Sequence, residues 1–165
     1  MTHLHPICEE LKRCGIRFAV TIPDQWLAPL DTALRNDPAI TLVPVAREEE
    51  GVGICAGLYF GNQKSALIIQ NAGLLAATNS LNGVAVELQI PMLILVSYRG
   101  SMGDTYRYQF PKGKATEPLL RALDIPYYML KKPDEVGTIA KAQEFAYACS
   151  TPVAVLLGKE ALEQK

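Results

Sequence analysis

Apolar and polar residues follow one another along the chain in a regular order of short strands and longer helices. Between the apolar runs, apolar residues recur at helical spacing, as Ile7, Leu11 and Cys14 do in the first helix. Strands that alternate with helices are typical of a doubly wound α/β domain, with a parallel sheet covered by helices on both faces. We expect one such domain over residues 1–165, with about six strands. The predicted strands are 17–22, 40–45, 65–70, 92–97, 127–130 and 152–157.

The segments between the strands predict six helices and one long loop. The loop runs from Tyr98 to Lys114 and is polar and rich in aromatic residues. Connections this long in a compact domain tend to be functional or mobile. The predicted helices are 5–14, 25–35, 48–60, 76–88, 115–123 and 133–149.

Composition narrows the possible functions of the chain. Its net charge of −1 comes from evenly mixed signs, so neither a basic stripe for nucleic acid nor a polybasic run for a membrane surface is present in the sequence. Its apolar stretches are shorter than the roughly 20 residues that a membrane span needs, and the first residues do not read as a secretory signal. We expect a cytoplasmic protein that binds neither nucleic acid nor membrane.

Cysteines and histidines predict no metal centre. The four cysteines are scattered without a Cys-x-x-Cys pair, and we interpret them as buried small apolar residues. His3 and His5 could form a metal pair, but their place near the start of the chain favours solvated side chains.

Three consecutive carboxylates, Glu48, Glu49 and Glu50, stand where the third predicted helix begins. The field of a helix N-terminus favours negative charge, so a solvated first turn explains them on residue pattern alone. Successive helical positions point about 100° apart, however, and the three cannot share one environment. A carboxylate held in apolar surroundings has a raised pKa and becomes a usable acid or base. Both interpretations remain open at this point.

Glycines on the same helix raise a second question. Gly53 and Gly57 each lower helix stability relative to alanine, which indicates a close approach by another backbone or by a subunit. Ordinary packing is the alternative.

Polar residues follow the first, third and fourth predicted strands. Asp24 comes after the first strand, where an N-cap is its simplest role. Gln70 ends the third strand, Asn71 follows it, and Arg99 follows the fourth. In open parallel sheets, ligands bind beyond the carboxyl ends of the strands, although many such loops are only turns. The loop cations Arg99, Arg107, Lys112 and Lys114 would suit a doubly acidic substrate, and equally a solvated surface or a subunit contact.

A family resemblance rests on the glutamate segment. Glu49-Glu50-Gly51, followed by Ala56 and Tyr59, resembles the segment that carries the catalytic glutamate in the pyrimidine-binding domain of thiamine diphosphate enzymes. The matches extend over about residues 22–127. Three segments are similar to the alpha subunits of sulfopyruvate decarboxylases and to the matching half of phosphonopyruvate decarboxylases. They are the string from Arg47 to Gly57, Gln70-Asn71-Ala72-Gly73-Leu74 and Ser97-Tyr98-Arg99-Gly100.

The resemblance implies roles for particular residues. Glu49 would activate the cofactor, thiamine diphosphate, by sharing a proton with a nitrogen of its aminopyrimidine ring. Gln70, Asn71 and Gly73 would line the pocket around that ring or the substrate. Asp24 and Arg99 would contact the substrate, a small 2-oxo acid, and Asp24 could also shuttle protons.

The resemblance also implies a partner. Thiamine diphosphate enzymes hold the diphosphate through a divalent metal, at a Gly-Asp-Gly motif with a later Asn. Gly103-Asp104-Thr105 is the nearest string, and no Asn follows Asn82. The domain that binds the diphosphate and Mg²⁺ is therefore expected on a separate chain, in a hetero-oligomer with homodimeric contacts.

The implied activity is decarboxylation of sulfopyruvate. Alternatives are phosphonopyruvate decarboxylation and carboligation of the acetolactate type. A different class remains open as well, a non-catalytic α/β binding or regulatory subunit, although no dinucleotide or phosphate-loop motif is present.

Overall fold

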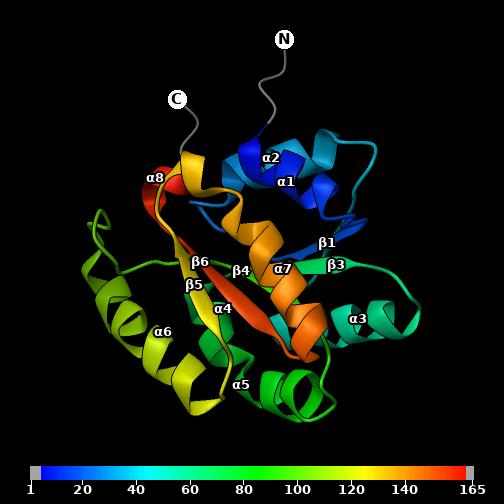
Figure 1. The fold of residues 1–165 in the computed structure, drawn as a ribbon. Helices are drawn as coiled ribbons and strands as arrows, with labels where there is room; N and C mark the ends of the chain where they lie inside the picture. The colour runs from blue at the N-terminus through cyan, green and yellow to red at the C-terminus, as the bar shows by residue number, and fades with distance from the viewer. Residues whose placement is uncertain (1–4, 163–165) are drawn as a thin grey trace.

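The computed structural model describes residues 5–162, and within them six short strands form one parallel sheet (Figure 1). Neighbouring strands follow the order β2-β1-β3-β4-β6-β5, and each pairing is parallel. Helices cover both faces, so the predicted doubly wound α/β fold is confirmed. The strands are β1 (Phe18–Thr21), β2 (Thr41–Pro44), β3 (Ser65–Gln70), β4 (Leu93–Ser97), β5 (Tyr127–Leu130) and β6 (Val153–Leu157).

The three central strands are almost wholly buried. Each side chain of β4 and β6 is buried, and in β3 the first and last residues, Ser65 and Gln70, are partly exposed. Helices lie against both faces of these strands, which explains why nearly every position is apolar and why polar residues do not alternate with apolar ones. The edge strands β2 and β5 are more exposed.

Each face of the sheet has its own hydrophobic core. Leu11 of α1, Leu30 of α2 and Ile139 of α7 belong to one core, and Val52 of α3 and Leu120 of α6 belong to the other. No helix within residues 5–162 is long and apolar enough to cross a membrane. The helices are α1 (Pro6–Arg13), α2 (Ala28–Asn36), α3 (Glu48–Phe60), α4 (Asn71–Ala76), α5 (Thr78–Ser80), η1 (Leu81–Val86), η2 (Arg107–Gln109), α6 (Phe110–Ala122), η3 (Pro133–Glu135), α7 (Thr138–Cys149) and α8 (Lys159–Leu162).

Two helices begin earlier than the sequence predicts. The segment expected from Ala76 is already helical at Asn71, directly after β3, and it continues through α5 into the π-helical turn η1. Helix α6 begins at Phe110 instead of Ala115, which shortens the predicted loop. Pro111 suits that start because a proline at the first helical positions removes an N–H that has no intrahelical acceptor.

The helix α3 approaches the sheet closely at a glycine that the sequence did not single out. A Cβ on Gly51 would lie 2.7 Å from Leu67 Cδ1, so any larger residue here requires the buried Leu67 side chain to move. At Gly53 and Gly57, by contrast, no other segment of the described chain comes within 4 Å of the site of a Cβ. The predicted close approach by this chain's own backbone is therefore wrong for these two glycines, and the predicted subunit contact remains a prediction.

His5 is buried, and the expectation of a solvated side chain is wrong for it. It is 1% exposed and forms the N-cap of α1, where Nδ1 accepts a hydrogen bond from Ile7 N at 3.2 Å. Burial lowers the pKa of its imidazole because it disfavours the charged form. His3 lies outside the described residues.

Candidate functional site

Three polar side chains that the sequence singled out meet at the carboxyl edge of the sheet. Asp24 follows β1, Gln70 ends β3 and Arg99 follows β4. These strands are parallel neighbours, so their carboxyl ends lie side by side. We take this edge as the candidate site.

The carboxylate of Asp24 is held by four donors. Ser97 Oγ donates to it at 2.9 Å, the backbone N–H of Trp26 at 3.2 Å and Arg99 Nη1 at 3.3 Å, and Gln70 Nε2 is the fourth donor. The Asp24 side chain is 6% exposed. Asp24 therefore ties together the ends of β1, β3 and β4, and its contact with a substrate remains a prediction.

Arg99 is buried, with both of its charged contacts inside the chain. The guanidinium is 2% exposed, and Nε and Nη2 donate to the two oxygens of Asp104 at 2.8 and 3.4 Å. The rings of Trp26 and Tyr106 lie 4.5 and 5.6 Å from its central carbon. The guanidinium is therefore paired with two carboxylates of its own chain, and its contact with an acidic substrate remains a prediction.

Asp104 is the main partner of Arg99, and the sequence pattern does not predict this role for it. Burial opposes ionisation of its carboxyl, but hydrogen bonds from Arg99 and from the N–H groups of Gly100 and Tyr106 outweigh that effect and lower its pKa to about 2. In the sequence, Asp104 stands in Gly103-Asp104-Thr105, which indicates only an incomplete metal motif. Nothing in it pointed to an arginine five residues earlier.

Asn71 holds the backbone of Arg99 by a side-chain hydrogen bond. It is fully buried, and its Nδ2 donates to Arg99 O at 2.8 Å and to Thr116 Oγ1 at 3.0 Å. Its Oδ1 has no hydrogen-bond partner among the described residues. The amide thus fixes the backbone of Arg99 against α6. Its predicted place in the cofactor pocket remains a prediction.

The three carboxylates at the start of α3 have different surroundings, as the sequence predicted. Glu50 Oε2 accepts from the N–H groups of Ala46 and Arg47 at 3.1 and 3.3 Å and caps the helix. Glu48 packs over Gly73, where any Cβ would collide with its side chain. Glu49 is 33% exposed, and its Oε1 lies 3.5 Å from Arg47 Nη2. Glu49 is therefore the one carboxylate of these three that neither caps the helix nor packs on Gly73.

The other loop cations lie near the surface. Arg107 and Lys114 are exposed, and Lys112 lies 5.1 Å from the ring centroid of Tyr108. Arg107 belongs to η2, whereas Lys112 and Lys114 belong to α6 and not to a loop.

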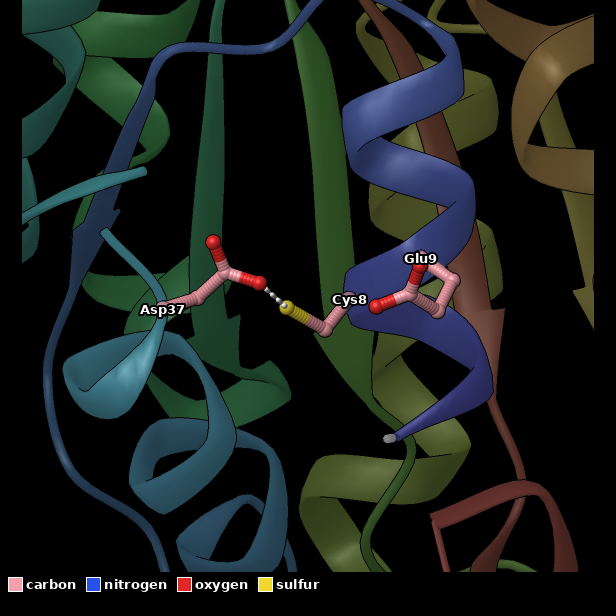
Figure 2. Close-up of side chains that lie close together, drawn as sticks. All are labelled: Cys8, Glu9 and Asp37. Carbon is pink, nitrogen blue, oxygen red and sulfur yellow. Dashed lines mark hydrogen bonds between the residues drawn. The ribbon is translucent and has the colours of Figure 1, made fainter. Parts of the chain in front are cut away.

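A second cluster of charged groups joins α1 to the end of α2. Figure 2 shows Cys8, Glu9 and Asp37, whose ligating atoms lie close enough to share a metal ion. The ammonium of Lys12, however, is 2.7 Å from both Glu9 Oε1 and Asp37 Oδ2 and already supplies a cation there. Burial raises the pKa of the Cys8 thiol to about 11, which keeps it protonated and able to donate to Asp37. We interpret this cluster as a structural ion-pair network that connects α1 to the residue after α2.

Comparison with known proteins adds independent evidence. Residues 1–112 match the family described as the thiamine pyrophosphate enzyme, N-terminal TPP binding domain. The sulfopyruvate decarboxylase subunit alpha of Methanococcus maripaludis is 38% identical over 144 residues, 87% of this chain and 86% of the relative. That of Methanothermobacter thermautotrophicus is 38% identical over 148 residues, 89% and 90% of the two chains.

A longer relative covers the chain almost completely. The sulfopyruvate decarboxylase of Methanosarcina acetivorans is 31% identical over 158 residues, which make up 95% of this chain and 40% of the relative. The family match spans more than half of the chain, and the two subunit alpha relatives align over 86% and 90% of their own length. The chain therefore belongs to the thiamine pyrophosphate enzyme family, as its N-terminal TPP binding domain.

Proposed function

We propose that the chain is the alpha-type subunit of a thiamine diphosphate-dependent 2-oxo acid decarboxylase that converts sulfopyruvate to sulfoacetaldehyde and CO₂. Support comes from relatives named sulfopyruvate decarboxylase subunit alpha that align over 86–90% of their own length. Together with the family match, these names favour one activity over the other reactions of thiamine diphosphate enzymes.

The observation that carries the proposal is the state of Glu49. Glu48 packs on Gly73 and Glu50 caps the helix, whereas the Glu49 carboxylate takes part in neither contact, is partly exposed and has Arg47 beside it. A carboxyl there fits an aminopyrimidine, because it can share a proton with a ring nitrogen. When bound, thiamine diphosphate supplies the electron sink for the loss of CO₂.

The residues around Glu49 would orient the reactants. Arg47 lies beside the Glu49 carboxylate, with 3.5 Å between Arg47 Nη2 and Glu49 Oε1, and would hold it in position. The tie through Asp24, Gln70 and Arg99 fixes the ends of three strands, so the floor of the site is rigid before any ligand arrives.

The proposal includes a second chain that carries the diphosphate-binding domain and holds Mg²⁺. The sequence lacks the Gly-Asp-Gly motif with a later Asn, and the chain aligns with 40% of the longer relative from Methanosarcina acetivorans. We infer that the counterpart of the rest is a separate polypeptide, joined to this one in a hetero-oligomer with homodimeric contacts.

The experiment is reconstitution with the candidate partner chain and a decarboxylation assay on sulfopyruvate. Glu49→Gln keeps the shape of the side chain and removes the proton-sharing group, and we expect turnover to fall about 10²- to 10⁴-fold. Glu87→Gln, an exposed glutamate elsewhere on the chain, is the matched control and should leave turnover unchanged. Full activity of the Glu49→Gln complex would refute the assigned role.

Substrate profiling separates the remaining activities. Phosphonopyruvate assayed in parallel tests the related decarboxylase, and formation of acetolactate from pyruvate tests carboligation. A complex that binds thiamine diphosphate and turns over none of these acids would favour a non-catalytic subunit.

A further inference from the structure

Helix α3 exposes a side that carries no charge beyond its first turn. Its other side packs on the sheet and is buried. The residues on the exposed side, which we call the α3 face, are Gly53, Ile54, Gly57 and Phe60. Ile54 is 37% exposed and Phe60 is 70% exposed. A helix that is apolar on all sides is typically buried on all sides, so the α3 face indicates a surface that another polypeptide covers.

The α3 face differs from the exposed sides of other helices in the same domain. From Gly51 to Val86, the one charged residue is Lys64, which lies between α3 and β3. By contrast, exposed positions of α2, α6 and α7 include Arg35, Lys114 and Lys141. Helix surfaces in contact with water normally carry such charges, whereas the centres of protein interfaces are depleted of them. The lack of charge therefore favours an interface over a solvated surface.

Gly53 and Gly57 add a steric observation. A Cβ at either position would have open space, because no other segment of the described chain comes within 4 Å, so packing within this chain does not require a glycine there. Each glycine nevertheless lowers helix stability relative to alanine. The two are about one turn apart and leave about 6 Å of the helix without side chains on this side. Such a surface allows a second backbone to approach closely.

The neighbouring segment η1 adds no charge to this side of the domain. It packs beside α3 on the same face of the sheet (Figure 1). Its residues Asn82 and Gly83 are exposed and uncharged, and a Cβ on Gly83 would also have open space. The first charged residue after η1 is Glu87, just beyond its end. Charges thus border this surface at its ends and are missing from its middle.

The α3 face begins at the proposed catalytic carboxylate. Glu49, Gly53 and Gly57 follow one another at intervals of four residues, and residues at this spacing lie on one side of a helix. Gly53 and Gly57 are therefore about 6 and 12 Å from Glu49 along the helix axis. A polypeptide that holds the rest of a cofactor against Glu49 meets Gly53 next on the same side of α3. This continuity with the candidate site identifies the polypeptide that covers the α3 face.

We propose that the second polypeptide, which carries the diphosphate-binding domain, packs an uncharged helix against the α3 face, with its backbone closest at Gly53 and Gly57. This inference rests on the proposed function, because the shared cofactor is what requires a second chain beside Glu49. Assembly of the two chains and completion of the cofactor site are then one event, since both use the same side of α3.

The test measures the association of this chain with the candidate partner chain by calorimetry, in the presence of thiamine diphosphate and Mg²⁺. Gly53→Leu adds a side chain where the unassembled chain has open space, so the variant alone should unfold at or above the wild-type temperature. Its affinity for the partner should fall at least about 100-fold, because the added side chain keeps the two backbones apart. Ala148→Leu, at an exposed position of α7 on the opposite face of the sheet, is the matched control and should leave the affinity unchanged.

Turnover separates this proposal from the proposed function. Gly53→Leu should lose turnover at low concentrations of the partner and regain it as the partner concentration rises, whereas Glu49→Gln should associate normally and stay inactive. Weaker association of Gly53→Leu together with full activity of Glu49→Gln would support the interface and refute the role of Glu49.

Two results would overturn the proposal. One is an unchanged affinity of Gly53→Leu for the partner chain. The other is a loss confined to self-association of this chain, which would assign the α3 face to a contact between two copies.

Discussion

Replacing Asp104 by asparagine tests the buried ion pairs of Arg99 with Asp24 and Asp104 at the carboxyl edge, which we call the tie. The substitution preserves the shape of the side chain and removes its charge. The Asp104 carboxylate is 1% exposed and accepts hydrogen bonds from two guanidinium nitrogens of Arg99 and from the backbone N–H groups of Gly100 and Tyr106. In the variant, Arg99 would keep a single charged partner, Asp24, at 3.3 Å.

The expected cost follows from the burial of Arg99. Removal of one partner from a buried ion pair costs about 3–5 kcal/mol, because the other charge is left without full compensation. Asp24 still compensates part of the charge, and asparagine retains one acceptor oxygen, so we take the lower end, about 3 kcal/mol. With an unfolding entropy of about 2.1 cal/mol/K per residue, a chain of 165 residues would lose about 9 °C in Tm.

The assay is urea denaturation of the wild-type and variant chains, with thermal unfolding as a second readout. Asp134→Asn is the control, since Asp134 is exposed in η3 and should change the free energy of unfolding by less than about 0.5 kcal/mol. A free energy of unfolding within about 1 kcal/mol of the wild type for the Asp104→Asn variant would refute the tie as we describe it.

Three further predictions concern a histidine, two glycines and the cofactor. The pKa of His5 is lowered in the folded chain, so the unfolded chain takes up a proton first as pH falls below about 6.5. The Tm should therefore decrease between pH 7 and pH 5. The variant His5→Asn keeps an N-cap and should make the Tm less dependent on pH. Gly73→Ala should cost about 1–3 kcal/mol in urea denaturation because its methyl group meets Glu48, whereas Gly53→Ala has open space and should stabilise the isolated chain by about 0.5–1 kcal/mol. Equal effects of the two alanines would contradict the packing described. Calorimetry should detect weak or no binding of thiamine diphosphate and Mg²⁺ to this chain without a partner, and tight binding would show that the partner is not needed to hold them.

Much of the fold follows from local pattern. The run from Ser65 to Gln70 predicts β3 residue for residue, because a central parallel strand is buried on both faces and leaves no polar position to blur its ends. Helix starts were harder to predict. Asn71 and Phe110 begin helices in place of loops, because tertiary contacts of the Asn71 amide and of Gly113 with backbone atoms of Arg99 and Gly100 hold those turns in position.

Some features of the candidate site could likewise be predicted from the sequence, and others could not. Family resemblance pointed to Glu49, and helix geometry predicted that its neighbours would differ from it. Neither could reveal that Arg99 pairs with Asp104, because that contact depends on the course of a nine-residue connection and not on spacing. The burial of His5 is also a long-range effect, since residues at the far end of the chain, including Leu162, lie beside it.

The tie at the carboxyl edge has an electrostatic consequence for any acidic substrate. Asp24, Arg99 and Asp104 together carry one surplus negative charge, and Glu49 with Arg47 beside it adds no net charge. A dianion that approaches this edge therefore meets repulsion from these groups, and attraction has to come from other cations, such as Arg107 or a metal ion held by the second polypeptide. Recognition of the acid would then become strong only once the two chains have assembled, and the assembled complex, not the subunit, would set the selectivity.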